Sequence, residues 1–169
     1  LINYVEDRDL WRWALPGSRE VSAACSLLSL SLEDRETLMA TPIAELRARG
    51  EIVLAHQNRL IEQGAFYRPR RIIGGCDVPC VPCQFPSLLS ELGHALCRGE
   101  LFSATYQVRN DGSAKVSLRS NENGLDVSEI AKAYGGGGHK HAAGFSVPDI
   151  ETLEFVHPVS GSPEPEAAR

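Results

Sequence analysis

Residues 135–144 have the sequence Gly-Gly-Gly-Gly-His-Lys-His-Ala-Ala-Gly, which is the most informative stretch of the chain. Four consecutive glycines lose much conformational entropy on ordering, so an ordered run serves positive φ angles or close approach to a ligand. A flexible linker fits badly, because the small residues that follow lead into an apolar strand. Glycine amides that face one point bind an anion, and we expect a short helix starting near His139 to add its dipole.

The segments around the glycine run alternate between strand and helix patterns. We predict an element order β-β-α-β-β-α-β over residues 71–147, which describes a compact α+β domain with a mixed sheet. The predicted elements are strands at 71–74 and 78–81, a helix at 87–98, strands at 101–109 and 115–119 joined by a turn at 110–112, a helix at 127–134 capped by Asp126, and a strand at 144–147.

The first 65 residues are predicted to be mostly helical and to belong to another unit. We expect a short strand with an acidic turn at residues 1–13, a helix at 18–30 capped by Ser18, and a helix at 41–65 capped by Thr41. Gly50 weakens the last of these. This long helix either connects two lobes or is an ordinary amphipathic surface helix.

Composition excludes several classes of protein. The 169 residues carry a formal net charge of −5, which disfavours a basic face that grips long duplex nucleic acid but allows a small phosphate pocket. No apolar run is long enough to span a membrane. Five cysteines, an odd number, do not indicate a disulfide framework, so we expect a cytoplasmic protein.

The cysteines leave two alternatives open. Cys76, Cys80 and Cys83, with His94 and Cys97 following, contain the ligand types of a Cys₃His zinc site. Alternating strand positions point to opposite faces, so Cys80 and Cys83 would diverge along a straight strand. We therefore favour buried apolar cysteines over a zinc site.

Three blocks of sequence resemble one known domain. The glycine run with its histidine, the segment Val-Ser-Leu-Arg-Ser at 116–120 and the segment Leu-Asp-Val-Ser-Glu-Ile-Ala at 125–131 resemble the C-terminal DHH-associated domain of DHH-family phosphoesterases. That family includes oligoribonuclease-type enzymes, cyclic-dinucleotide phosphodiesterases and exonucleases. Residues 4–11 also resemble the end of the catalytic DHH domain in the oligoribonuclease-like branch.

The resemblance implies a domain organisation. Residues 1–40 would be the C-terminal remnant of a DHH catalytic domain, and 41–65 would be the linker helix. Residues 66–148 would form the substrate-binding DHH-associated domain, and 149–169 a tail that is disordered at its end. The first residue is Leu1, in an apolar segment, and we interpret the chain as a fragment.

The resemblance also implies which residues bind substrate. His139 would contact a phosphate, the glycines would let the backbone approach it, Arg119 would pair with a phosphate or stack on a base, and Ser120 would add a hydroxyl. An ordinary surface arginine at a strand end is the alternative for Arg119. The implied phosphate-binding residues are Arg119, Ser120, Gly136, Gly137, Gly138 and His139.

The family's reaction needs a metal site that this chain does not supply by itself. Two Mn²⁺ ions are held in the family by an Asp-His-His motif and further aspartates, and Asp-His-His does not occur here. Asp7, with Asp9 as second choice, matches one ligand, and a plain acidic turn cap is the alternative. His139 and His141 alone are too few for a metal site. We expect no hydrolysis by this chain alone.

Three functions remain open. The chain is the substrate-binding part of a DHH phosphodiesterase that acts on short oligonucleotides or dinucleotides, a stand-alone nucleic-acid-binding module, or a degenerate structural fragment. The resemblance of residues 4–11 favours the first. A homodimer is compatible with the sequence, and no membrane partner is expected.

Overall fold

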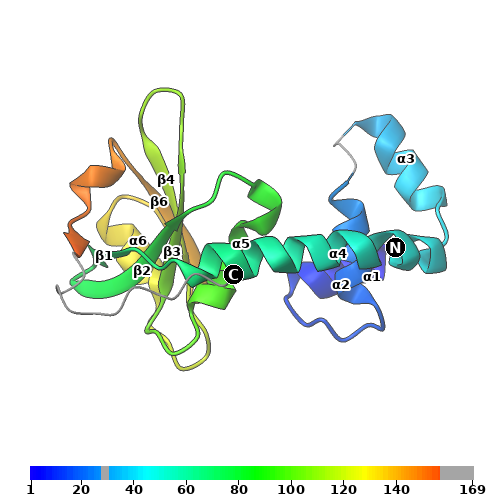
Figure 1. Cartoon of the computed structure of the whole chain (residues 1–169), viewed down its shortest axis with the longest axis horizontal. Coiled ribbons are helices and arrows are strands. Elements are labelled where there is room, and N and C mark those ends of the chain that lie inside the picture. The colour runs from blue at the N-terminus through cyan, green and yellow to red at the C-terminus, as the bar shows by residue number, and fades with distance from the viewer. Residues whose placement is uncertain (28–30, 157–169) are drawn as a thin grey trace, which may run out of the picture. The chain divides into compact units, whose positions relative to one another are not determined.

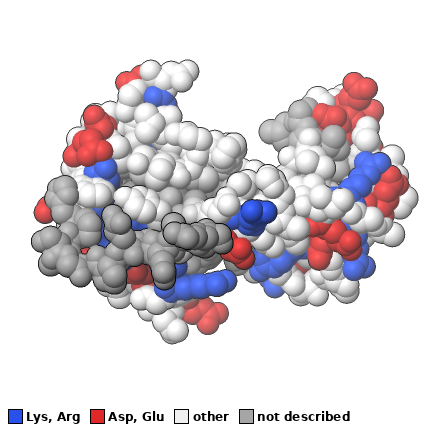
Figure 2. Space-filling view, viewed as in Figure 1, with Lys and Arg blue, Asp and Glu red and all other residues white. Residues whose placement is uncertain are grey.

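The computed structural model describes residues 1–27 and 31–156, which divide after Gln63 into two compact units. The end of the predicted helix at 28–30 and the predicted disorder near the C-terminus lie outside the described residues. No described helix is both long enough and apolar enough to cross a membrane. On the face shown in Figure 2, acidic and basic side chains are interspersed.

The first unit is helical, and the strand predicted at its start is wrong. Residues 1–5 instead enter a helix, in which Leu1 and Tyr4 lie one turn apart and pack against Val21, Ala24 and Leu46. In a helix, residues three apart lie on the same face, so both can reach one apolar cluster. In a strand they would point to opposite faces. The helices are α1 (Ile2–Asp9), α2 (Ser18–Cys25), α3 (Leu32–Ala40) and α4 (Ile43–Phe66).

Two predicted helix caps are also wrong. Ser18 is the first residue of α2, and the cap is Gly17 in a left-handed conformation. Thr41 ends α3, and its hydroxyl donates to the Thr37 carbonyl, 2.7 Å away, instead of capping α4. Helix α3 itself was not predicted. Ser31 caps it by accepting a hydrogen bond from the Asp34 amide.

Helix α4 is a single helix of 24 residues that crosses from the first unit into the second. Gly50, expected to weaken it, is buried where α2 passes close by. A Cβ at this position would overlap the Glu20 carbonyl oxygen. The glycine therefore allows the two helices to approach, and this packing compensates for its low helix propensity.

The second unit is built on one mixed sheet of seven strands in the order β5-β6-β4-β3-β2-β1-β7. Only β2 and β3 pair in parallel, and the connection between them carries α5. The α+β class is confirmed. The elements are β1 (Arg70–Ile73), β2 (Cys76–Pro82), η1 (Pro86–Leu88), α5 (Leu89–Leu96), β3 (Ser103–Val108), β4 (Ala114–Arg119), α6 (Val127–Ala133), β5 (Gly137–His139), β6 (Ala142–Val147), η2 (Ile150–Thr152) and β7 (Phe155–Val156).

The two faces of this sheet differ in chemistry. On one face, alternate residues of the central strands are buried and apolar, and α6 packs on them through Val127 and Ala131. Helix α5 packs on the opposite face, over β3 and β4 (Figure 1). The core therefore lies on the α6 side, and the second face is only partly covered.

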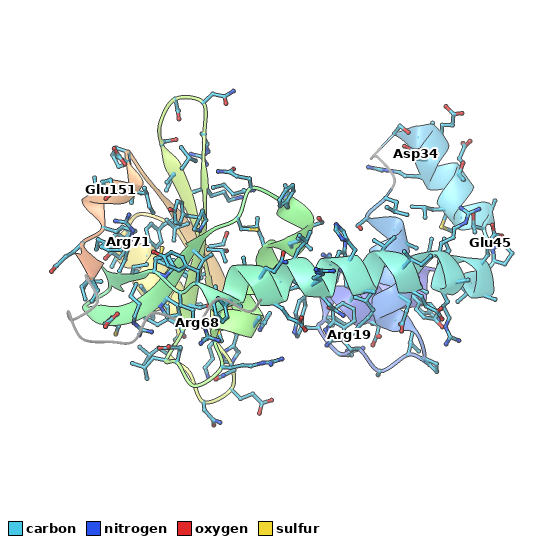
Figure 3. The ribbon with its side chains drawn as sticks, in the orientation of Figure 1. Arg19, Asp34, Glu45, Arg68, Arg71 and Glu151 are labelled. Atoms are coloured by element: carbon cyan, nitrogen blue, oxygen red, sulfur yellow. The ribbon has the colours of Figure 1, made fainter. Side chains whose placement is uncertain are left out.

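An ion pair holds the last strand to the sheet. Arg71 is buried, and its guanidinium donates to Glu151, at 2.6 Å, and to the Leu153 carbonyl, at 2.5 Å (Figure 3). Its guanidinium also lies over the Phe155 ring. Residues 149–156, assigned to the tail by sequence, are thus ordered as η2 and β7.

Candidate functional site

The sheet register brings two of the predicted binding residues onto one face. Arg119 of β4 pairs with Ala142 of β6, and Ala142 pairs with His139 of β5. Directly opposed residues of antiparallel strands project to the same side. Arg119 and His139 therefore flank Ala142 on the face that α6 does not cover.

The next row of the same face is made of small residues. Ser117 of β4 pairs with Gly144 of β6, and Gly144 pairs with Gly137 of β5. All three are only partly buried, whereas the intervening residues Val116 and Phe145 are buried in the core. Small side chains beside Arg119 and His139 leave a shallow floor, which we call the small-residue floor: Ser117, Gly137, Ala142 and Gly144.

Arg119 is half-buried at the edge of α5. Its guanidinium donates to the Leu118 carbonyl and to the Ser90 hydroxyl, both at 2.8 Å. Burial lowers the pKa of Arg119, while Cys97 and Glu91 oppose that shift. In the described ranges no carboxylate forms an ion pair with this guanidinium. A half-buried arginine whose hydrogen-bond partners are neutral, and which no carboxylate pairs with directly, suits an anionic ligand better than a surface role.

The glycine run has a different structure from the one predicted. No helix begins near His139, which lies in β5 and is exposed, so the expected helix dipole is absent. The Gly135 amide donates to the Lys132 carbonyl and the Gly136 amide to the Ala131 carbonyl, which closes the end of α6. These two amides are therefore unavailable to an anion.

Three of the four glycines are required by the fold. Gly135 has φ +76°, a conformation that side chains disfavour. A Cβ on Gly136 would overlap the Gly144 carbonyl oxygen, and one on Gly138, at φ +145°, would lie 2.5 Å from Ala143 Cα. Gly137 differs, because its φ is ordinary and a Cβ there would meet no atom within 4 Å.

Ser120 supports the turn between β5 and β6. Its hydroxyl lies 3.0 Å from His141 Nδ1 and 3.4 Å from the Lys140 carbonyl, and its amide donates to the His141 carbonyl. The Val127 amide donates to the Lys140 carbonyl as well. Ser120 is only 1% exposed, so its hydroxyl positions the turn and faces away from a ligand on the open surface.

Asp7 lies in the first unit, where its carboxylate shapes a loop. The carboxylate accepts hydrogen bonds from the Ala14 and Leu15 amides, at 3.0 and 3.2 Å. The pKa of Asp7 lies below its ordinary value. The nearby Ser18 hydroxyl lowers it most, although this buried hydroxyl forms no hydrogen bond of ordinary geometry, and the two amides lower it further. This is the capping role that was weighed against metal binding.

Metal-binding groups are not gathered in the part of the chain that the structure describes. Residues 1–27 and 31–156 contain no group of three or more His, Cys, Asp or Glu placed to hold an ion. Cys80 and Cys83 are buried, and burial raises the pKa of both thiols, that of Cys80 to about 12. Both the Asp7 surroundings and the cysteines thus lack the donor set for a metal.

Sequence reasoning missed the small-residue floor and the role of His141. The blocks containing Arg119 and His139 were recognised, but only the pairing register shows that they share a face. In β4, Ser117 and Arg119 alternate with apolar residues, and this alternation indicates that one face of the strand is open. His141 was noted only as unusual, and the structure makes it the partner of Ser120.

The family model described as the DHHA1 domain matches residues 98–157, a range that contains Arg119, the glycine run and the small-residue floor. The match lies in the second unit and supports a C-terminal domain of the DHH superfamily there. The predicted resemblance to the C-terminal domain of the DHH superfamily is confirmed.

Two curated proteins are similar to this chain. Oligoribonuclease NrnB of Bacillus subtilis (strain 168) is 45% identical over 67 residues, which cover 40% of this chain and 17% of that protein. Uncharacterized protein R106 of Acanthamoeba polyphaga mimivirus is 25% identical over 156 residues, or 88% of this chain and 37% of that protein. The chain thus spans about a sixth of the first relative and just over a third of the second.

A solved structure shares the fold. The pGpG-specific phosphodiesterase PggH from Vibrio cholerae superposes with a TM-score of 0.50 at 11% identity, covering 89% of this chain and 62% of that one. This likeness extends over both units but concerns the fold alone.

Proposed function

We propose that this chain is the substrate-binding part of a DHH phosphodiesterase and that its open sheet face holds a short oligonucleotide or dinucleotide. The proposal rests on one observation: Arg119 and His139 lie on the same face, on either side of Ala142, and next to Gly137, a glycine that the fold itself does not require. Arg119 supplies a planar cation for phosphate, and His139 supplies an exposed ring nitrogen as donor. The relative from Bacillus subtilis, an oligoribonuclease, supports this class of substrate.

Gly137 marks the place where the ligand would come close to the backbone. With no side chain at Gly137 or Gly144, a phosphate can come close to the backbone of β5 and β6. Gly136 and Gly138 hold β5 against β6, and Ser120 fixes the adjoining turn. Three of the predicted binding residues therefore act by positioning, and Arg119, Gly137 and His139 act by contact.

The catalytic metal belongs, in this proposal, to a DHH domain of which residues 1–40 are the remnant. Two Mn²⁺ ions would polarise the phosphate and supply the attacking hydroxide. Asp7 would contribute one ligand at most, and the described residues do not provide the rest. We therefore assign binding, and no step of hydrolysis, to this chain. Residues 41–65 would be the linker, 66–148 the binding domain, and the cytoplasm the compartment.

A titration with 5′-phosphorylated diadenylate tests the binding role. Arg119→Ala and His139→Ala should each weaken binding, the first by about tenfold or more, because a hydrogen bond to a charged group contributes about 1.5–3 kcal/mol. Arg98→Ala, which removes an equal charge from an exposed residue, is the matched control. Unchanged affinity in both site variants would sink the proposal. Affinity for long single strands but none for the dinucleotide would favour the stand-alone nucleic-acid-binding module.

A further inference from the structure

The open face of the sheet continues beyond the small-residue floor. Lys115 of β4 pairs with Ser146 of β6, and both are exposed on the same side as Arg119 and His139. The guanidinium of Arg109, which follows β3, donates to the hydroxyl of Ser146 at 3.3 Å. The far end of the face therefore carries two cations, Lys115 and Arg109, which we call the distal basic pair.

Neither member of the distal basic pair is neutralised by an ion pair in the described ranges. Arg109 donates to the hydroxyls of Ser113 and Ser146, which are neutral. The carboxylate of Asp111 accepts a hydrogen bond from the Ser113 hydroxyl, and chiefly this bond, together with the charge of Arg109, lowers the pKa of Asp111. Asp111 thus moderates the positive charge of Arg109, whereas Lys115 forms no ion pair within residues 1–27 and 31–156.

Distance along the strand sets how long a ligand would have to be. Lys115 and Arg119 are four residues apart on β4, which is about 13 Å at about 3.3 Å per residue. One strand of B-DNA carries a phosphate about every 3.4 Å of helix axis, and at that spacing the span corresponds to about four nucleotides. A dinucleotide held at Arg119 and His139 does not reach Lys115, whereas a longer oligonucleotide does.

We infer that the distal basic pair binds the backbone phosphates of a single-stranded oligonucleotide whose end is held at Arg119 and His139, so that the face prefers oligonucleotides of about four or more residues. This rests on the proposed function and adds a length preference to it. Proteins that bind single strands use cations that follow the phosphate backbone, together with aromatic side chains on which bases stack, and this face supplies the cations. The net charge of −5 is compatible, because only local cations are needed.

The test compares two ligand lengths on the full chain. 5′-Phosphorylated diadenylate and hexa-adenylate are titrated into wild type, Lys115→Ala and Lys132→Ala at several salt concentrations. Lys132 is an exposed lysine on α6, which packs on the opposite face, so it is a charge-matched control. Wild type should bind the hexamer more tightly than the dimer.

Loss of one phosphate contact should weaken hexamer binding about fivefold at 0.1 M salt and reduce the slope of log affinity against log salt by about 0.7. Dimer binding by Lys115→Ala should stay unchanged, as should hexamer binding by Lys132→Ala. Equal affinities for both lengths, or equal effects of Lys115→Ala on both, overturn the length preference while leaving the proposed function intact. Absence of dimer and hexamer binding in wild type overturns both.

Discussion

Replacing Gly137 by alanine tests whether a glycine is needed at this position for ligand binding, because the fold does not need one there. A methyl group there meets no atom within 4 Å and the φ angle is ordinary. The free energy of unfolding should therefore stay within about 0.5 kcal/mol of wild type. If a phosphate approaches the backbone at this point, the same methyl should cost about 1–3 kcal/mol in binding, as overpacking does. Dinucleotide affinity would then fall about tenfold or more.

The neighbouring glycines provide matched controls with the opposite profile. Gly136→Ala would drive a methyl into the Gly144 carbonyl oxygen and to 2.7 Å from Phe145 Cβ. Gly138→Ala would force an alanine to φ +145° beside Ala143. Each should lose about 1–3 kcal/mol of stability, from overpacking in the first and backbone strain in the second.

Urea denaturation measures the stability of each variant, and a dinucleotide titration measures its affinity. A stable Gly137→Ala protein with wild-type affinity refutes ligand approach at this glycine. An unstable Gly137→Ala protein refutes the conclusion that the space beside it is open. Destabilised Gly136→Ala and Gly138→Ala proteins show that the assay detects the difference between structural glycines and the one that the fold leaves free.

Three further changes test other parts of the structure. Ser120→Ala should lower stability by about 1 kcal/mol, since a buried hydroxyl's hydrogen bond to His141 is lost; amide exchange at the β5–β6 turn should rise, and unchanged exchange would contradict the positioning role. Asp7→Asn should lower the unfolding temperature at pH 7. Because the folded-state pKa of Asp7 lies below its ordinary 3.8, this deficit should shrink as pH falls below about 3.8, and a pH-independent deficit would argue against the carboxylate. Gly50→Ala should destabilise the first unit by about 1–3 kcal/mol through its overlap with Glu20, whereas a more stable variant would refute the close approach of α2 and α4.

Much of the second unit follows from local sequence. The Asn-Asp-Gly turn at 110–112 separates two strands as predicted, and Asp126 caps α6 by accepting from the Ser128 amide. These elements are specified by short-range chemistry that a few residues carry. The same holds for the helix predicted at 41–65, which the structure has as α4.

Features that depend on pairing or on distant neighbours were not predictable. Four glycines in a row are compatible with an anion-binding loop, with a helix end and with an edge strand, and only the contacts with Ala131 and Gly144 distinguish these. Residues 1–5 have a strand-like composition, but the cluster around Leu46 selects a helix. Asp7 was noticed for its family position, whereas its backbone partners lie seven and eight residues later.

The parallel pairing of β2 with β3 has a consequence for the width of the binding surface. A parallel connection must cross over the sheet, and here that crossover carries α5. A helix about 10 Å across covers about two strands spaced about 4.8 Å apart. This crossover helix therefore covers β3 and part of β4 and ends beside Arg119, so the length of the segment between β2 and β3 determines how much of the proposed binding face stays uncovered.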